Sequence, residues 1–232
     1  MSELVNQVVL ITGAKGGLGT AVTKAFLVAE AQVVGTSKTI QSSDFASPRF
    51  TPIAGDLTVA DNATYVVAET VRRFQKIDAL VHVMGGFAGG QPIPETDDAT
   101  WDRMMAMNLR SALNILRAAI PVMRKARRGR IVAIASRQAV EPAANLSAYN
   151  VSKAALVALV RTAALENKDA GVTANAILPG TMDTDANRKA MPGADVSRWV
   201  QTERVAELVR FLVSDAGAQI TGAAIPFYGL EI

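Results

Sequence analysis

The sequence predicts an α/β fold in which a doubly wound parallel sheet of about seven strands carries helices on both faces. Short apolar segments rich in β-branched residues alternate with longer segments in which apolar residues recur every three or four positions. Strands that are apolar on both faces are typical of sheets covered by helices on both sides, and the alternation indicates βαβ units. With 232 residues, half of them hydrophobic, the chain can bury a large core, and we expect one domain spanning residues 1–232.

The expected elements follow in order along the chain. Strands are expected at residues 8–12, 32–36, 50–54, 79–83, 130–135, 173–178 and 224–227. Helices are expected at residues 17–30, 59–75, 99–126, 147–168 and 202–213, the second of which has Val67, Val71 and Phe74 on one face. The longest irregular stretch is residues 181–201. Loops of this length in a compact domain are usually functional, so we expect a lid over the substrate there.

The composition excludes several classes of function. The chain has no cysteine and one histidine, so we expect neither a disulfide, nor a thiolate nucleophile, nor a metal site. It has no apolar run of the roughly 18 residues that cross a membrane and no signal peptide, which predicts a cytoplasmic protein. A net charge of +3 is too small to indicate nucleic acid. The basic cluster at residues 124–130 ends a predicted helix, where cations suit the helix dipole.

Gly13, Gly17 and Gly19 form a glycine-rich turn at the first strand-to-helix junction, with Lys15 and Leu18 between them. Such a turn permits positive φ, lets the backbone approach a pyrophosphate, and offers the N–H groups of the helix start to an anion. The Gly-Lys-Ser/Thr ending of a P-loop does not occur here. A tight turn without a ligand would explain the glycines alone, but their position favours dinucleotide binding.

The end of the second strand bears on which dinucleotide is bound. An acidic residue here would bond the ribose hydroxyls of NAD, and a basic residue would pair with the 2′-phosphate of NADP. Ser37 and Lys38 offer a hydroxyl and a cation, and the first acid downstream is Asp44. We therefore expect NADP(H) to be favoured over NAD(H). The alternative is that Lys38 is a solvated surface lysine.

Tyr149 and Lys153 form a second candidate site. They are four residues apart, so they share a helix face if the helix begins at Ser147. A phenol titrates near 10, and a nearby ammonium group lowers its pKa toward the range useful for proton transfer. Together with the glycine turn, this pair predicts a nicotinamide-dependent oxidoreductase. A core tyrosine with a surface lysine would explain the pair alone.

At this point the chain resembles the short-chain dehydrogenases/reductases, and among them the 3-oxoacyl-ACP reductases. The resemblance runs from residue 12 to residue 229, with the motifs in the family's order. Residues 12–19 resemble its TGxxxGxG turn, and Asp56 and Leu57 match the segment whose acid bonds the adenine amine. Asn108 matches the asparagine of the long fourth helix. Ser136 lies 149 − 136 = 13 residues before Tyr149, which is the usual interval.

The resemblance implies a Rossmann fold and a role for each reacting residue. Tyr149 is expected to be the general acid in carbonyl reduction and the base in alcohol oxidation. Lys153 is expected to bond the nicotinamide ribose and lower the tyrosine pKa, Ser136 to hold the substrate oxygen, and Asn108 to hold a water. The cofactor supplies the hydride to a carbonyl, or takes it from a secondary alcohol.

The resemblance also implies contacts with the cofactor. Gly85 is expected to support the nicotinamide, and Pro179, Gly180 and Thr184 match the PGxxxT segment that receives its amide. The cofactor-binding residues expected in all are Gly13, Lys15, Gly17, Leu18, Gly19, Ser37, Lys38, Asp56, Leu57, Gly85, Pro179, Gly180 and Thr184.

Three segments depart from the family pattern. His82-Val83-Met84-Gly85 stands where Asn-Asn-Ala-Gly is usual, so we expect the hydrogen bonds under the cofactor to be loosened or rewired. His82 is expected to be buried with a satisfied ring nitrogen rather than catalytic. Gly16 stands where many NADP-preferring members carry a basic residue. The end of the chain, residues 226–229, reads Pro-Phe-Tyr-Gly where Val-Asp-Gly-Gly is common, which predicts a different C-terminal wall.

Residues 85–90 contain four glycines in addition to Phe87 and Ala88, and resemble a segment of dihydropteridine reductase. We favour a flexible glycine loop around a packed Phe87, and a pterin reductase stays as an alternative. A non-catalytic dinucleotide-binding protein is the other alternative. The apolar surface of the helix at 147–168 predicts a homo-oligomer, a dimer or tetramer, because the family pairs its two long helices. That surface could instead face only its own sheet.

Overall fold

The computed structural model describes residues 4–230 of the chain. Seven parallel strands form the central sheet in the order β3-β2-β1-β4-β5-β6-β9. They are β1 (Val8–Thr12), β2 (Gln32–Thr36), β3 (Phe50–Pro52), β4 (Ala79–His82), β5 (Gly129–Ile134), β6 (Val172–Pro179) and β9 (Ala224–Phe227). The strand order reverses between β1 and β4. Ligands of such sheets bind at this reversal, outside the carboxyl ends of the strands.

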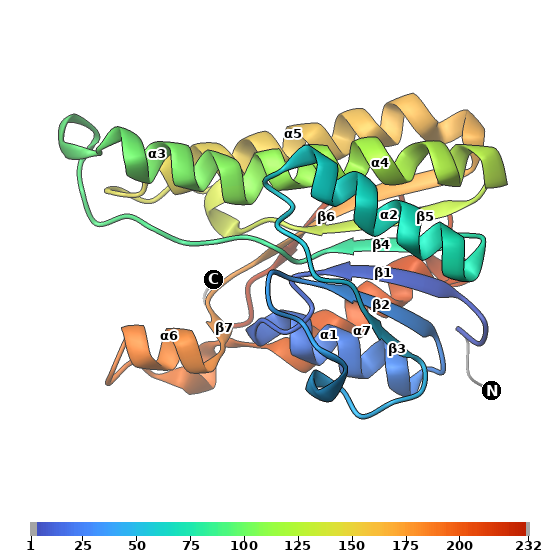
Figure 1. The fold of residues 1–232 in the computed structure, drawn as a ribbon. Coiled ribbons are helices and arrows are strands. Elements are labelled where there is room, and N and C mark those ends of the chain that lie inside the picture. The colour runs from blue at the N-terminus through green and yellow to red at the C-terminus, as the bar shows by residue number, and fades with distance from the viewer. Residues whose placement is uncertain (1–3, 231–232) are drawn as a thin grey trace.

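Helices cover both faces of the sheet (Figure 1). One face carries α1 (Gly17–Val28) and α7 (Thr202–Val213). The other carries α2 (Ala60–Phe74), α3 (Asp98–Met105), α4 (Ser111–Ala126) and α5 (Ser147–Asn167). The predicted doubly wound fold is therefore confirmed.

The sheet has a buried core on each face. Val9 and Ile11 of β1 belong to the core under α1 and α7, whereas Leu10 between them belongs to the core under α2, α4 and α5. Successive side chains of a strand point to opposite faces, so a strand between two helical layers must be apolar at every position. This is the physical reason why the strands were recognisable as continuous apolar runs.

The helix expected at residues 99–126 is divided. Between α3 and α4 the chain forms a π-helical turn, Ala106–Arg110, which contains Asn108. A π-helical turn inside an α-helix is rare and is frequently found at a functional site. Helical periodicity predicts both α-helical parts, but it does not predict one extra residue in a turn.

The stretch at residues 181–201, here called the lid segment, is more regular than expected. It contains β7 (Met182–Asp183), α6 (Asp185–Ala190) and β8 (Val200–Gln201), and β7 pairs with β8 in a separate two-stranded sheet. The hydroxyl of Thr184 caps α6 by accepting from Asn187 N at 3.2 Å. The prediction of an irregular stretch was wrong because elements this short lack a full hydrophobic period. Figure 1 shows α6 at the edge of the molecule where the parallel strands end.

No helix in residues 4–230 combines the length and the apolar composition that crossing a membrane would require.

Candidate active site

The four residues expected to do the chemistry lie together at the carboxyl edge of the sheet. Ser136 follows β5, Tyr149 and Lys153 lie in the first turns of α5, and Asn108 lies in the π-helical turn. The hydroxyls of Ser136 and Tyr149 are hydrogen-bonded to each other. Lys153 Nζ donates to the Ile134 carbonyl at 3.0 Å and lies 6.0 Å from the centre of the Tyr149 ring. We call this group the reaction end.

Burial governs the ionisation of Tyr149 and Lys153. Desolvation raises the pKa of Tyr149, and the hydrogen bond between Tyr149 and Ser136 lowers it in part. Desolvation also lowers the pKa of Lys153 to about 8. The expectation that Lys153 lowers the tyrosine pKa is not met in this structure, in which the ammonium group donates to the Ile134 carbonyl and lies 6.0 Å from the centre of the ring.

Asn108 holds the chain that follows β4. Its Oδ1 accepts from Gly86 N at 2.8 Å, and its Nδ2 donates to Gly86 O at 3.1 Å and to Ser152 Oγ at 3.0 Å. The side chain is fully buried. It therefore ties the segment after β4 to α5, a positioning role that the sequence analysis missed.

Gly85 is required by close packing at the same place. A Cβ atom at Gly85 would lie 2.8 Å from Asn108 Oδ1 and 3.1 Å from Lys153 Nζ. The absence of a side chain thus lets the backbone after β4 pass directly over these two polar groups.

His82 stands where the family pattern has its first asparagine, and both of its ring nitrogens contact hydroxyl groups. Ser111 donates its proton to Met107 O at 2.6 Å, so it accepts from His82 Nε2, over a long contact of 3.5 Å. His82 Nδ1 then accepts from the Thr12 hydroxyl at 2.9 Å. Burial lowers the pKa of His82 to about 3, which keeps the ring neutral. The predicted burial and satisfied ring nitrogen are confirmed.

The glycine turn is packed against two other segments. Gly13 has φ +65°, and a Cβ atom there would lie 2.9 Å from Met84 N. A Cβ atom at Gly19 would lie 1.9 Å from Gly13 O, and one at Gly17 would lie 2.9 Å from the Thr184 methyl group. The turn therefore brings Thr184 of the lid segment to the start of α1, where the first N–H groups of the helix have no partner within it. Leu18 is buried in the core, so only its backbone can face a ligand.

The second group of expected cofactor residues lies at the ends of β2 and β3, and we call it the adenosine end. Thr36 Oγ1 and Ser37 Oγ are buried and have no hydrogen-bond partner among the described residues. Buried hydroxyls are rarely left unpaired, so these two atoms suit a polar ligand such as a ribose or a phosphate. Leu57 has a buried side chain, which leaves only its backbone for a ligand.

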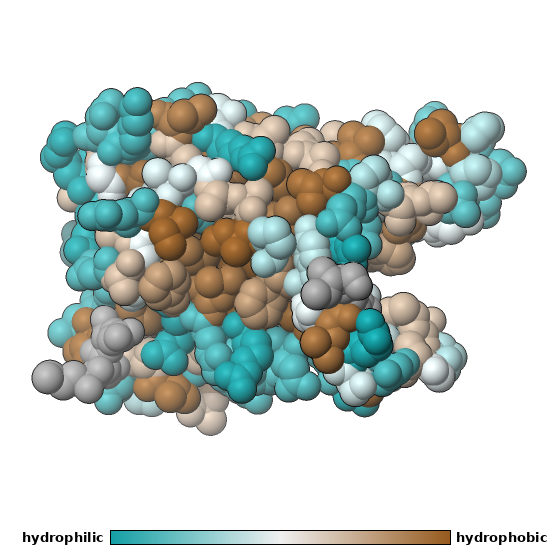
Figure 2. Space-filling view, turned by 180° about the vertical axis from the view of Figure 1, so that it is seen from behind, coloured by the Kyte–Doolittle hydropathy of each residue, from teal (hydrophilic) through white to brown (hydrophobic). Residues whose placement is uncertain are grey.

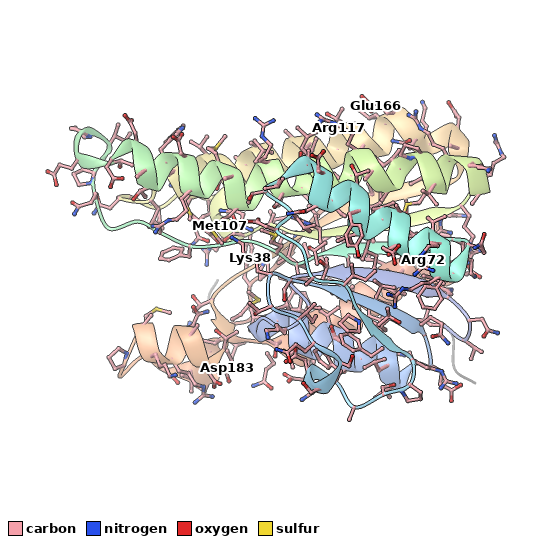
Figure 3. All side chains as sticks on the ribbon, viewed as in Figure 1. Lys38, Arg72, Met107, Arg117, Glu166 and Asp183 are labelled. Atoms are coloured by element: carbon pink, nitrogen blue, oxygen red, sulfur yellow. The ribbon has the colours of Figure 1, made fainter. Side chains whose placement is uncertain are left out.

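Both lysines of the adenosine end already have acidic partners. Lys38 Nζ lies 2.8 Å from Asp56 Oδ2, and this contact is the main reason why the pKa of Asp56 is lowered. Lys15 Nζ donates to Thr39 O at 2.8 Å and lies 3.4 Å from Asp44. Figure 3 shows Lys38 at the edge of the sheet where the strands end. Lys38 is exposed and ion-paired, so the alternative of a solvated surface lysine stays open.

Pro179 and Gly180 lie at the end of β6, beside β9. Pro179 pairs in register with Phe227, and Gly180 N donates to Phe227 O at 3.0 Å. The C-terminal strand therefore fixes the segment expected to receive the nicotinamide amide.

A cavity of about 650 Å³ opens next to the reaction end. Its lining includes Arg137, Gln138, Glu141, Gly180, Thr181 and Arg198. Gln138 connects the cavity to the chemistry, because the Ser136 hydroxyl donates to its side-chain oxygen. Gln138 and both arginines were not among the site residues predicted from the sequence. The position of Gln138, two residues after Ser136, was the available signal.

Phe87 stands next to the reaction end and is not packed in a core. It is 67% exposed, and its ring meets the Tyr149 ring nearly edge-on with centroids 5.0 Å apart. The surrounding glycine loop is attached to the segment before α5: Gly90 N donates to Asn145 O at 2.7 Å, and a Cβ atom at Gly89 would lie 2.1 Å from Leu146. The expectation of a packed Phe87 was wrong because the backbone, not the ring, holds this loop.

Comparisons with known proteins converge on one family. The family described as "short chain dehydrogenase" matches residues 7–195. The short-chain dehydrogenase/reductase olcF of Penicillium canescens is 32% identical, over 97% of this chain and 96% of its own. The D-beta-hydroxybutyrate dehydrogenase of Rhizobium meliloti (strain 1021) is 30% identical, over 95% of this chain and 96% of its own. The crystal structure of gox2181 superposes with a TM-score of 0.92 at 26% identity, over 98% of this chain and 96% of that one.

Proposed function

This chain belongs to the short-chain dehydrogenase/reductase family, and from that membership we propose that it transfers a hydride between NADP(H) and a carbonyl or secondary-alcohol substrate, with Tyr149 as acid and base. The observation that carries the proposal is the meeting of Asn108, Ser136, Tyr149 and Lys153 beside the 650 Å³ cavity.

The polar groups of the reaction end suit proton transfer to an oxygen atom. The nicotinamide, when bound, supplies the hydride to the carbonyl carbon. The Tyr149 hydroxyl then gives its proton to the substrate oxygen, which Ser136 holds by a hydrogen bond. With a pKa of about 8, Lys153 can exchange a proton near neutral pH and can replace the proton that Tyr149 loses.

NADP(H) is the proposed cofactor because the adenosine end offers cations and unpaired hydroxyls. Ser37 Oγ suits a ribose or phosphate oxygen, and Lys38 and Lys15 are the nearby cations. A 2′-phosphate would draw Lys38 from Asp56, which would then be released to accept the adenine amine. The glycine turn, with the start of α1 and Thr184, would hold the pyrophosphate.

An assay panel tests the proposed function and separates its alternatives. Purified protein is mixed with NADPH and ketones, 3-oxoacyl esters, quinones or a quinonoid dihydropterin, and absorbance is followed at the nicotinamide band. We expect turnover of ketones or 3-oxoacyl compounds. Turnover of the pterin alone would favour the alternative suggested by the resemblance of residues 85–90. Tight NADPH binding without any turnover would favour a non-catalytic dinucleotide-binding protein.

We also propose a homo-oligomer. Among the exposed apolar residues of α5 are Val151 and Leu165, the latter 71% exposed. β9 is an edge strand of the sheet, and Figure 2 shows hydrophobic residues gathered across the middle of the rear face. Light scattering at micromolar concentration should give a dimer or a tetramer, and a monomer would contradict the proposal.

A further inference from the structure

The cavity beside the reaction end is lined by two arginines, of which Arg137 forms an ion pair and Arg198 forms none within residues 4–230. Arg137 Nε donates to Glu141 at 2.6 Å, and Arg137 also stacks on Tyr228, 4.9 Å from its ring centre. Glu141 in turn is hydrogen-bonded to the Tyr228 side chain. This carboxylate is therefore bonded to both Arg137 and Tyr228.

Arg198, on the lid segment, has a neutral partner. Its Nη2 donates to the Leu230 carbonyl at 2.7 Å. None of the ion pairs within residues 4–230 involves Arg198. The nearest acid along the chain, Asp195, accepts from the backbone and the hydroxyl of Ser197, and Arg198 acts on it through Coulombic attraction without forming an ion pair. The cavity lining therefore carries a net charge of +1 from Arg137, Glu141 and Arg198.

The backbone of Arg198 is held in place on both sides. Leu230 N donates to Arg198 O at 3.2 Å, and a Cβ atom at Gly229 would lie 3.0 Å from the same oxygen. Trp199 is buried, and Val200 N donates to Thr181 O at 2.8 Å, which ties the lid segment to another residue of the cavity. With its backbone held in this way and its Nη2 bonded to Leu230 O, Arg198 has less conformational freedom to lose when it binds an anion.

We propose that the substrate is an oxo acid or hydroxy acid whose carboxylate binds Arg198, while its carbonyl or hydroxyl group faces Ser136 and Tyr149. The inference rests on the proposed function and adds the substrate class. A planar guanidinium matches a carboxylate with two parallel hydrogen bonds. Gln138 lines the same cavity as Arg198 and contacts Ser136, so this cavity adjoins the reacting residues. The reaction interconverts the ketone and alcohol of the acid and leaves its carboxylate unchanged.

A series of paired compounds tests the proposal. Methyl-ketone acids with an increasing number of methylene groups between ketone and carboxylate are compared with their neutral primary amides, as substrates with NADPH. Wild-type protein should prefer the acid over its amide by about tenfold or more in kcat/KM at the best chain length. Arg198→Gln should remove most of that preference. The matched control is Arg204→Ala, which removes one exposed positive charge from α7 outside the cavity and should keep the preference.

A binding measurement separates failure of this inference from failure of the proposed function. A ketone cannot be reduced by the oxidised cofactor, so calorimetric titration of acid and amide into the protein with NADP⁺ measures binding without turnover. Tighter binding of the acid that is lost in Arg198→Gln supports the inference, even where no compound is turned over and the proposed function fails. Equal binding of acid and amide by wild type, or an unchanged preference in Arg198→Gln, would overturn it.

Discussion

Lys153 and Lys38 lie at opposite ends of the proposed cofactor site, and their side chains have very different surroundings. Lys153 is 5% exposed, donates to a backbone carbonyl, and has a pKa lowered to about 8 by burial. The side chain of Lys38 is 65% exposed and is paired with Asp56 at 2.8 Å. Water screens Lys38 strongly and Lys153 hardly at all.

The difference extends to the neighbours of each lysine. At the reaction end, Asn108 and Gly85 leave no room for another arrangement, because a single added carbon atom at Gly85 would overlap the amide of Asn108. At the adenosine end, two lysines and two aspartates form exposed pairs that can be exchanged for a ligand. We infer that packing fixes the positions of the reacting side chains, and that a few exposed charges determine which cofactor is preferred. Changes at the reaction end should therefore have the larger effects.

Replacing Tyr149 with Phe should have the largest effect. The change removes the transferable proton and the hydrogen bond to Ser136 but keeps the ring and its contact with Phe87. We expect kcat/KM to fall by about 10² to 10⁴, as is typical when acid–base catalysis is lost, and NADPH affinity to change little. Steady-state kinetics and fluorescence titration measure the two quantities.

Tyr65→Phe is the matched control, since Tyr65 is an exposed tyrosine on α2. It should behave like wild type in both measurements. Near-normal turnover by Tyr149→Phe would refute the proposed mechanism.

Replacing His82 with Asn tests whether the buried histidine limits stability in acid. In the folded chain the pKa of His82 is lowered from 6.5 to about 3, so between these pH values the unfolded chain binds a proton that the folded chain does not. Protonation of His82 in the unfolded chain therefore lowers the free energy of unfolding as the pH falls through this window. The decrease is roughly 2–3 kcal/mol between pH 6.5 and 4.5. Asparagine does not titrate.

Denaturant unfolding at several pH values gives the free energies for wild type and His82→Asn. The difference between the two proteins should change in favour of the variant by this amount as the pH is lowered from 6.5 to 4.5. A difference that stays constant over the window would show that His82 binds its proton equally well in the folded and the unfolded chain.

Replacing Gly85 with Ala tests the close packing of the reaction end. The added Cβ atom would lie within 2.8 Å of Asn108 Oδ1 and 3.1 Å of Lys153 Nζ, so both side chains must move. Overpacking of this kind costs about 1–3 kcal/mol of stability. Thermal unfolding measures that loss, and the displacement of Lys153 should also lower kcat. A variant with wild-type stability and kcat would show that the two side chains can move freely.

The sequence predicted those parts of the molecule that depend on short spacings. The continuous apolar strands, the four-residue interval between Tyr149 and Lys153, and the glycine turn are local patterns, and the structure contains each of them. The parallel direction of the strands follows from βαβ connections, whereas the strand order was not predicted.

Contacts between side chains on distant segments could not be predicted in the same way. The bonds of Asn108 to Gly86, of Lys38 to Asp56, and of Arg198 to Leu230 each join segments 18 to 32 residues apart, and they depend on how the loops pack. The direction of the Tyr149 pKa was also wrong for this reason. Spacing places Lys153 on the same helix face, but burial and the Ile134 carbonyl determine where its charge lies.

The smallest effect is expected from Lys38→Ala, which tests the adenosine end alone. A 2′-phosphate carries about two negative charges, and an exposed lysine pairing with it contributes on the order of 1 kcal/mol. The pair with Asp56 must open first, which keeps this contribution small. The KM for NADPH should therefore rise several-fold, while the KM for NADH stays nearly constant. Lys76→Ala is the matched control, because it breaks a similar exposed pair, with Asp78 at 2.8 Å, before β4 and outside the adenosine end.

Ser37→Asp should shift the preference further, since it adds repulsion against the phosphate and an acceptor for ribose hydroxyls. If Lys38→Ala leaves the ratio of the two KM values unchanged, the proposed preference for NADP(H) is wrong, and the reaction end would be unaffected by that result because its residues are held by packing that does not involve Lys38.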